Sequence, residues 1–251
     1  MIDIHCHILF ETDDGAQGFQ EAMEMCHIAE KDGIRIIFAT PHYIEGEVEN
    51  INVDDKLSLI NKELENRSMD LRILPGNEIY LSIDSYERLN CGDCKSLNGS
   101  KYALVELPAV EIPKYIPYAL YNMLVKGYVP IIAHPERNFK IIENPRLVYN
   151  LIMNGIMIQI NGTSLLGFYG KQVKKTAELL LKHQMVHFAA TDAHSSRHGG
   201  PVLSKIWDLT DKIGGRGTGK KLIHTNPMAV VENKDIIIEK PIKINVKTKL
   251  L

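Results

Sequence analysis

The sequence has few of the features that mark membrane, secreted or nucleic-acid-binding proteins. No apolar run approaches the ~20 residues that a membrane-spanning helix needs, and the first residues lack the basic segment and continuous apolar stretch of a signal peptide. The 29 lysines and arginines nearly balance the 31 aspartates and glutamates, and the formal net charge is −2. We therefore expect a cytoplasmic protein with no membrane insertion and no nucleic-acid partner.

Cysteine is also scarce, with four residues in 251. We expect free thiols rather than a disulfide framework, and we interpret the single C-x2-C motif, Cys91–Cys94, as a turn. Cysteine-dependent phosphatases need an arginine six positions after the nucleophilic cysteine. The positions six residues after the four cysteines are Thr12, Asp32, Leu97 and Ser100. A cysteine phosphatase is thereby excluded.

What the sequence does contain is a regular alternation of short apolar runs and amphipathic segments. Strands covered on both faces are predicted at residues 2–6, 34–40, 71–78, 102–107, 128–134, 156–162 and 186–191. Helices are predicted at residues 20–31, 53–66, 114–126, 145–154, 171–183 and 202–213. This alternation indicates an α/β fold of parallel βα units, and seven units favour a closed or nearly closed barrel.

The barrel is predicted to occupy residues 1–232. Residues 233–251 differ in character, because they are rich in lysine and isoleucine and contain no glycine. This tail could be an extra strand on the body, a loose segment or a contact to another subunit. The sequence does not choose among these, and it leaves the oligomeric state open.

Metal-capable side chains follow nearly every predicted strand. In parallel α/β barrels the carboxyl ends of all strands face one rim, where the chemistry collects. In chain order the groups at these ends are His5 and His7, Asp13 and Asp14, His42, Glu78, Glu106, His134 and Arg137, Gln159 and Asn161, and Asp192 and His194.

Any one of these histidines would ordinarily be a hydrogen-bonded loop residue. The joint pattern indicates a multi-metal centre, since buried charges on one face are costly unless they are paired or coordinate a metal. The ligand set is imidazole and carboxylate without thiolate, because strand alternation points Cys6 away from His5 and His7. Such sites suit Mn, Fe or Zn bound openly, and His5 and His7 can chelate one ion together.

The motifs H-x-H, ATPH, GNE, AHPER and TDAH, in this order, resemble those of the polymerase-and-histidinol-phosphatase (PHP) superfamily. More closely, the stretches MIDIHCHIL, GNEIYL, LNGSKYALVELP, GYVPIIAHPER, QINGTSLLGFYG and HFAATDAHS are similar to the CpsB/YwqE group. That group contains manganese-dependent protein-tyrosine phosphatases of bacterial capsular and extracellular polysaccharide gene clusters. The resemblance covers the chain to about residue 230.

The resemblance implies a distorted (β/α)7 TIM-like barrel, the PHP fold, that holds three divalent ions. Mn²⁺ is the expected metal, with Fe, Zn, Co or Mg as alternatives. By position, the first ion is expected on His5, His7, Glu78 and Asp192, the second on Glu78, Glu106 and His134, and the third on Asp14, His42 and His194. A metal-held hydroxide would attack phosphorus. Arg137 would bind and stabilise the phosphoryl oxygens, and His198 is a further candidate for substrate binding.

The implied substrate is a phosphotyrosine protein, such as the tyrosine-rich tail of a bacterial tyrosine kinase that could recruit this protein to the inner membrane face. One alternative is a PHP phosphoesterase for a small molecule such as histidinol phosphate. An amidohydrolase is disfavoured, because that class typically uses a carboxylated lysine and no lysine stands at these strand ends. A third alternative is a non-catalytic regulator of the kinase.

Overall fold

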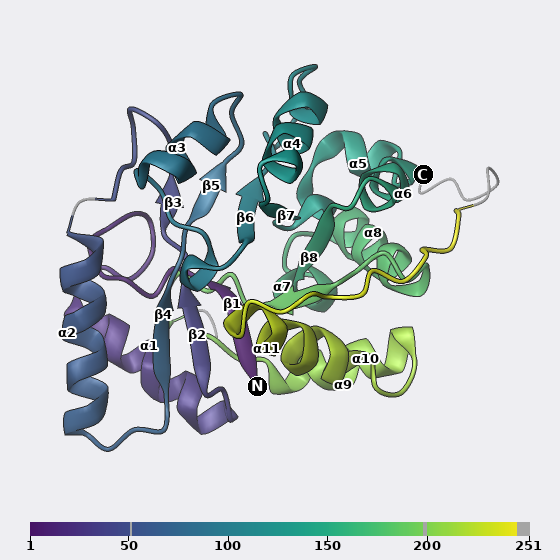
Figure 1. Ribbon diagram of the computed structural model, residues 1–251. Coiled ribbons are helices and arrows are strands. Elements are labelled where there is room, and N and C mark those ends of the chain that lie inside the picture. Colours follow the sequence, from purple (N-terminus) through teal and green to yellow (C-terminus); the bar gives the residue numbers. More distant parts are fainter. Residues whose placement is uncertain (51, 198–199, 245–251) are drawn as a thin grey trace.

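The computed structural model, which describes residues 1–50, 52–197 and 200–244, is built around a curled sheet of parallel strands (Figure 1). The strands are β1 (Ile2–Cys6), β2 (Ile36–Ala39), β3 (His42–Tyr43), β4 (Arg72–Pro75), β5 (Glu78–Tyr80), β6 (Tyr102–Glu106), β7 (Val129–Ile132), β8 (Met157–Asn161) and β9 (Phe188–Ala190). One sheet has the order β1-β2-β4 and the other β3-β5-β6-β7-β8-β9.

The two sheets are halves of one barrel. The chain runs from β2 into β3 and from β4 into β5 across short breaks at Pro41 and Gly76. Proline cannot donate to a ladder, and a Cβ at Gly76 would lie 2.8 Å from Leu97 Cδ2. The first and last strands meet where Asp192 N donates to His5 O at 2.8 Å. Counting each broken strand once gives seven, so the expected distorted (β/α)7 barrel is confirmed.

Helices follow the strands and cover the outside of the sheet (Figure 1). The longer ones are α1 (Phe19–Asp32), α2 (Val53–Asn66), α4 (Ile116–Val125), α6 (Arg146–Met153), α8 (Lys171–Lys182) and α9 (Ser204–Gly214), close to the predicted ranges. The shorter ones are α3 (Ser85–Cys91), η1 (Leu97–Gly99), η2 (Pro135–Arg137), α5 (Phe139–Glu143), α7 (Gly162–Leu166), α10 (Thr218–Lys220), η3 (Lys221–Thr225) and α11 (Asn226–Val231). The C-x2-C motif begins at Cys91, the last residue of α3, and continues as the predicted turn, with Gly92 at φ +83°.

The apolar core has two layers. Between the strands and helices lies an outer layer that includes Cys6, Cys26 and Ile158. Inside the barrel lies a second cluster, which we call the plug, made of Ile2, Ile4, Phe38, Leu74, Leu97, Tyr102, Leu104, Ile131, Ala133, Met157, Phe188, Ala190 and Val230. The plug fills the barrel below the rim at which the strands end, so the barrel is a packed core and not a pore.

A bulge in β1 changes which of its last side chains face the inside of the barrel. Ile4 belongs to the plug and Cys6 to the outer layer, and the pairing with β2 shifts register between Asp3 and Cys6. Asp3 is fully buried and accepts from His5 N at 3.4 Å and from Thr191 N at 3.0 Å. The bulge lets the strand pass from apolar to imidazole side chains on the same inner face.

The described part of the tail lies on the body without forming a strand. Tyr102 Oη donates to Lys234 O at 2.7 Å, and Ile242 N donates to His183 O at 2.9 Å. In Figure 1 this segment (yellow) runs from α11 past β8 toward α6 and α8. Ile244, at its end, is 7% exposed and joins the outer layer. Residues 233–244 therefore contact the chain's own body as an irregular segment and not as an extra strand.

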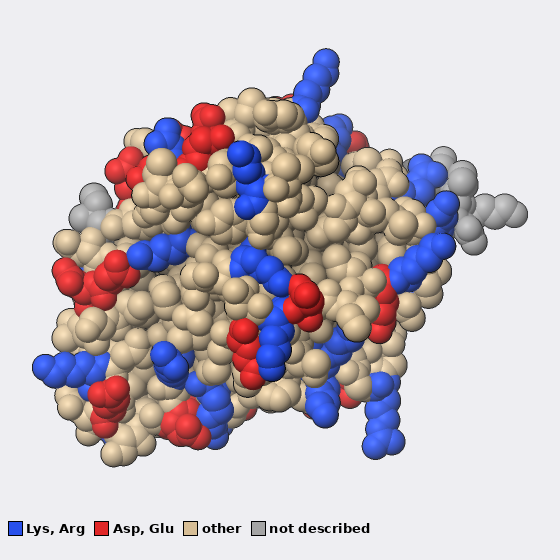
Figure 2. Space-filling model, in the orientation of Figure 1, with Lys and Arg blue, Asp and Glu red and all other residues tan. Residues whose placement is uncertain are grey.

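Charges of both signs are mixed on the face of the molecule that Figure 2 shows. In Figure 2, lysine and arginine (blue) are interspersed with aspartate and glutamate (red). No helix within the described ranges combines the length and apolar character needed to cross a bilayer.

Candidate metal centre

The barrel rim gathers all nine residues named as metal ligands by the sequence. Within the described ranges, ligand-capable atoms come within 4.8 Å of one another in three groups. The groups are His5, His7, Glu78 and Asp192; His7, Asp14, His42 and His194; and His42, Glu78 and Glu106. His134 joins through its Nε2 atom, which lies 2.7 Å from Glu78 Oε1. The predicted substrate-binding residue His198 lies outside the described residues.

The first group, His5, His7, Glu78 and Asp192, is fully buried, and five of the six distances between its ligand atoms are close to those of a tetrahedral site. His5 Nε2 lies 3.2 Å from His7 Nε2 and 3.1 Å from both Glu78 Oε2 and Asp192 Oδ1. His7 Nε2 lies 3.2 Å from Glu78 Oε2 and 3.3 Å from Asp192 Oδ1. Atoms bound tetrahedrally to one ion at about 2.0–2.1 Å are about 3.3–3.4 Å apart. The four atoms are therefore spaced to hold a single ion.

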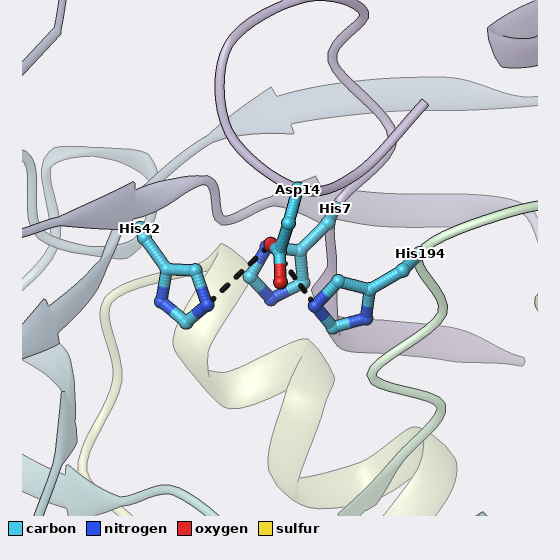
Figure 3. Close-up of side chains that lie close together, drawn as sticks. All are labelled: His7, Asp14, His42 and His194. Atoms are coloured by element: carbon cyan, nitrogen blue, oxygen red, sulfur yellow. Dashed lines mark ion pairs between the residues drawn. The ribbon is translucent and has the colours of Figure 1, made fainter. Parts of the chain in front are cut away.

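The second group, His7, Asp14, His42 and His194, opens to solvent. Figure 3 shows Asp14 between His42 and His194, with His7 beside it. Asp14 Oδ1 lies 3.6 Å from His42 Nε2 and 3.4 Å from His194 Nε2, and the Asp14 side chain is 67% exposed. The rings of His7 and His194 stack with centroids 3.9 Å apart. This group faces the mouth of the site, where a ligand exchanges with water readily.

The third group, His42, Glu78 and Glu106, differs in detail from the expected set of Glu78, Glu106 and His134. His42 Nδ1 lies 3.1 Å from Glu78 Oε2, whereas His134 Nε2 lies 4.0 Å from Glu106 Oε1. Both histidines thus flank the same two carboxylates. Burial, with the neighbouring charge of Glu78, raises the pKa of Glu106 to about 7.

The charges of the buried side chains stabilise each other. Burial opposes protonation of His5, but Glu78 and Asp192 outweigh it and raise the pKa of His5 to about 10. Burial also opposes ionisation of Glu78, yet His5 and His134 hold the pKa of Glu78 well below its usual range. Without a cation, protons on the histidines balance the carboxylates. Metal binding must therefore release protons.

Unpaired buried atoms test whether a metal fits. Of the seven buried side-chain nitrogen and oxygen atoms without a hydrogen bond in the described residues, three are His42 Nδ1, Glu78 Oε2 and Asp192 Oδ1. Leaving such atoms unpaired costs about 1–3 kcal/mol each, and all three belong to the groups above. Divalent ions at these groups would satisfy all three atoms. The residues present therefore fit a multinuclear centre with nitrogen and oxygen ligands.

Two of the side chains are held by a strained backbone. His134 has φ +31° and Asp192 has φ +53°, a left-handed conformation that non-glycine residues rarely adopt. His134 precedes η2, and Asp192 follows β9 at the point where the barrel closes. Backbone strain of this kind is typical of functional sites, where the surrounding structure enforces a geometry that the chain alone would avoid.

Three further residues orient the ligand-capable groups, and the sequence analysis gave them no role. Asp13 Oδ2 lies 2.7 Å from His7 Nδ1 and accepts from His42 N at 2.8 Å. Gln159 Oε1 lies 3.1 Å from His5 Nδ1, and its amide donates to Asn161 Oδ1 at 2.8 Å. Asn161 in turn donates to Asp192 Oδ2 at 2.6 Å. Their positions at strand ends were the available signal, because metal-binding histidines usually need such partners.

A cavity of about 570 Å³ opens above these groups. Arg137 lines it and donates from Nη1 to Asp192 Oδ2 at 3.0 Å, with its side chain 36% exposed. Its guanidinium carbon lies 4.4 Å from the centroid of the Tyr169 ring. Phe168 and Tyr169 form the aromatic part of the wall. The cavity thus combines a cation with the ligand-capable groups, as phosphate-ester binding requires.

Comparisons with known proteins agree with this geometry. The profile of a family described as "Capsular polysaccharide synthesis, CpsB/CapC" matches residues 1–232. Tyrosine-protein phosphatase YwqE of Bacillus subtilis is 42% identical over 78% of each chain, and CpsB of Streptococcus agalactiae is 31% identical over 93% of this chain and 99% of its own. A crystal structure of the YwqE/CpsB "unique metal-dependent tyrosine phosphatases" superposes with a TM-score of 0.91 at 36% identity, covering 98% of this chain and all of the other. Histidinol phosphate phosphatase from Lactococcus lactis shares the fold, with a TM-score of 0.57 at 17% identity over 85% and 93% of the chains.

Proposed function

The chain belongs to the CpsB/CapC family, and on that premise we infer that it is a metal-dependent tyrosine phosphatase of capsular polysaccharide synthesis. The observation that carries this inference is the buried group of His5, His7, Glu78 and Asp192, whose facing atoms are 3.1–3.3 Å apart. None of the described residues that line the cavity above this group is a cysteine. Cys6 is buried in the outer layer, and burial raises the pKa of its thiol well above the usual range.

The nine ligand-capable residues at the rim are proposed to hold three divalent ions, in the sets expected from the family resemblance. His5, His7, Glu78 and Asp192 would hold the first ion. The second would be held by Glu78, Glu106 and His134, and the third by Asp14, His42 and His194. When bound, such ions acidify water for attack on phosphorus and offset the negative charge that builds on the phosphoryl oxygens. Asp13 and Gln159 fix the ring orientations of His7 and His5.

Arg137 is proposed to bind the phosphoryl group. Its Nη1 atom is engaged by Asp192, and the rest of its planar guanidinium faces the cavity, where it can donate to two phosphoryl oxygens. The tyrosine leaving group has a pKa near ~10 and departs more readily than an alkyl alcohol. The reaction therefore places a smaller demand on a general acid than hydrolysis of phosphoserine would.

The finer assignments are proposals that the family context supports. Mn²⁺ is the proposed metal, since the ligands are imidazole and carboxylate without thiolate. The proposed substrate is the phosphorylated tyrosine-rich tail of a bacterial tyrosine kinase, which an open cavity at the rim would admit. We place the enzyme in the cytoplasm, and the kinase would bring it to the inner membrane face.

Metal content and phosphotyrosine-peptide turnover, measured on one preparation, test this function. We expect more than two ions per chain as purified or after loading, loss of turnover with chelator, and recovery with Mn²⁺. Calcium, which prefers six to eight oxygen ligands, serves as the control ion and should restore little activity. If metal binds but only small phosphate esters such as histidinol phosphate are hydrolysed, the substrate assignment is wrong. If no metal binds, the whole proposal fails.

A further inference from the structure

The rim contains a short aromatic segment that the mechanism above leaves without a role. Residues 167–170, Gly-Phe-Tyr-Gly, follow α7 directly. Both glycines have positive φ angles, +91° at Gly167 and +90° at Gly170. Residues that carry a side chain rarely adopt such angles. The two glycines thus bracket a tight excursion. Its two side chains, Phe168 and Tyr169, both line the cavity above the metal groups.

The two aromatic side chains differ in what they contact. Tyr169 packs against the guanidinium of Arg137 and so helps to hold that cation beside Asp192. Phe168 is 70% exposed, and within the described ranges no ring or cation is found against it. A single exposed phenylalanine is unremarkable on a protein surface. Here, however, the exposed ring shares one cavity with Arg137 and Glu106.

A phosphotyrosine bound in this cavity must place two chemically different ends. Its phosphoryl group belongs with Arg137 and the metal groups, which leaves the phenol ring to be covered by another part of the wall. Among the described residues that line the cavity, the aromatic side chains are Phe168, Tyr169 and the histidines of the metal groups. Because Tyr169 is committed to Arg137, Phe168 is the ring available for stacking.

We propose that Phe168 is the specificity-determining residue of this site, and that its ring packs against the phenol ring of the substrate and favours aryl over alkyl phosphate esters. This inference rests on the proposed tyrosine phosphatase function and deepens it. An alkyl ester such as phosphoserine presents no ring to Phe168 and would gain only the phosphoryl contacts. Selectivity for tyrosine would then arise in binding as well as in the leaving group.

Phosphonates separate binding from leaving-group chemistry, because their carbon–phosphorus bond is not hydrolysed. We would measure Kd for phenylphosphonate and methylphosphonate by calorimetry on the Mn²⁺-loaded full chain. The variants are Phe168→Ala, Phe168→Trp as the conservative replacement, and Tyr118→Ala as a matched control. Tyr118 is 60% exposed on α4 and does not line the cavity. Phosphotyrosine-peptide turnover is followed on the same preparations.

We expect wild type to bind phenylphosphonate about tenfold more tightly than methylphosphonate, in line with one aromatic stacking contact. Phe168→Ala should reduce this preference to within twofold, whereas Phe168→Trp and Tyr118→Ala should retain it. A preserved preference in Phe168→Ala, no preference in wild type, or no measurable binding of either phosphonate overturns the inference. Absence of peptide turnover together with an intact phenyl preference would instead refute the phosphatase assignment.

Discussion

The same strands build an apolar plug at one end and a charged centre at the other. Along β6, β8 and the residues that continue β9, every second side chain faces inward, and these side chains change from apolar to polar from one inward position to the next. The successions are Tyr102, Leu104 and Glu106; Met157, Gln159 and Asn161; and Phe188, Ala190 and Asp192. In the plug every side chain is at most 3% exposed. At the rim, buried atoms remain unpaired and two backbones are strained.

This contrast shows how stability and chemistry are divided within one barrel. The plug removes large apolar side chains from water and so favours the folded state. The rim concentrates ionisable groups that are costly to bury and are tolerated because they neutralise each other. Substitutions in the two regions should therefore affect different measurements, and each prediction below tests that separation.

The largest effect is expected at the rim and on catalysis alone. Arg137→Ala should lower kcat/KM for a phosphotyrosine peptide about 10³-fold, because the transition state loses a cation at the phosphoryl oxygens. Metal content and the urea midpoint should stay close to wild type. Arg146→Ala, on the exposed surface of α6, is the control and should leave kcat/KM unchanged. Equal losses of stability and activity in Arg137→Ala would contradict a separate role for the rim.

In the plug, a substitution is expected to lower stability and to leave the metal centre intact. Phe188 is fully buried, and Phe188→Ala should lower the free energy of unfolding by about 3–5 kcal/mol through lost burial and a cavity. Urea denaturation of the metal-free protein measures this loss. At temperatures where the variant is folded, its metal content should match wild type. Phe139→Ala, at a residue 49% exposed, should change stability by less than about 0.5 kcal/mol.

A smaller effect, on the pH dependence of the free energy of unfolding, is expected from His187, which precedes β9 at its plug end. Burial, with the nearby charge of Lys221, lowers the pKa of His187 to about 4, and its Nδ1 accepts from Ile158 N at 3.1 Å. Unfolding restores a pKa near ~6.5. The unfolded chain therefore binds the proton first, and stability is complete above about pH 6.5 and falls as the pH drops toward 4.

This loss amounts to about 2 kcal/mol between pH 7.5 and pH 5. His187→Asn keeps an acceptor for Ile158 N but cannot titrate, so its urea stability should fall by about 2 kcal/mol less than that of wild type over this interval. His27→Asn, at an exposed position on α1, is the control and should behave as wild type. The same pH dependence in wild type and His187→Asn would show that His187 is not responsible.

Periodicity predicted the regular elements well, because strands buried on both faces and amphipathic helices leave strong patterns in the chain. The helix predicted at residues 20–31 ends at Asp32 in the structure, where Gly33 follows with φ +91°. Short helices such as α7 escaped, since five residues hold too few apolar positions to show a helical period. Proline and glycine mark the two strand breaks, at Pro41 and Gly76, in the sequence. That the breaks lie side by side in the sheet is seen only from the pairing of β3 with β5.

At the site, the residue types and their places at strand ends brought the nine ligand-capable positions to one rim. Alternation alone does not explain why Ile4 and His5 both face inward; the β1 bulge, held by Asp3, does. The supporting role of Gln159 depends on a contact across the barrel, the 3.1 Å approach of its Oε1 to His5 Nδ1, 154 positions earlier in the chain. Asp13 and Asn161 act over shorter separations, on His7 and on Asp192. Contacts between residues more than 150 positions apart leave no periodic signal in a single sequence.

The contact between β1 and the residues after β9 also determines when, during synthesis of the chain, the barrel can close. Cys6 pairs with Ala193, and the hydrogen bond between their segments spans 187 positions. At a synthesis rate of about 5–20 residues per second, the ribosome would deliver Asp192 roughly 10–40 s after His5. During that interval the early histidines lack Asp192, and the barrel is not closed. The group formed by His5, His7, Glu78 and Asp192 is thus completed only when most of the chain has been made. Loading of the proposed first ion would then be a late step of biogenesis.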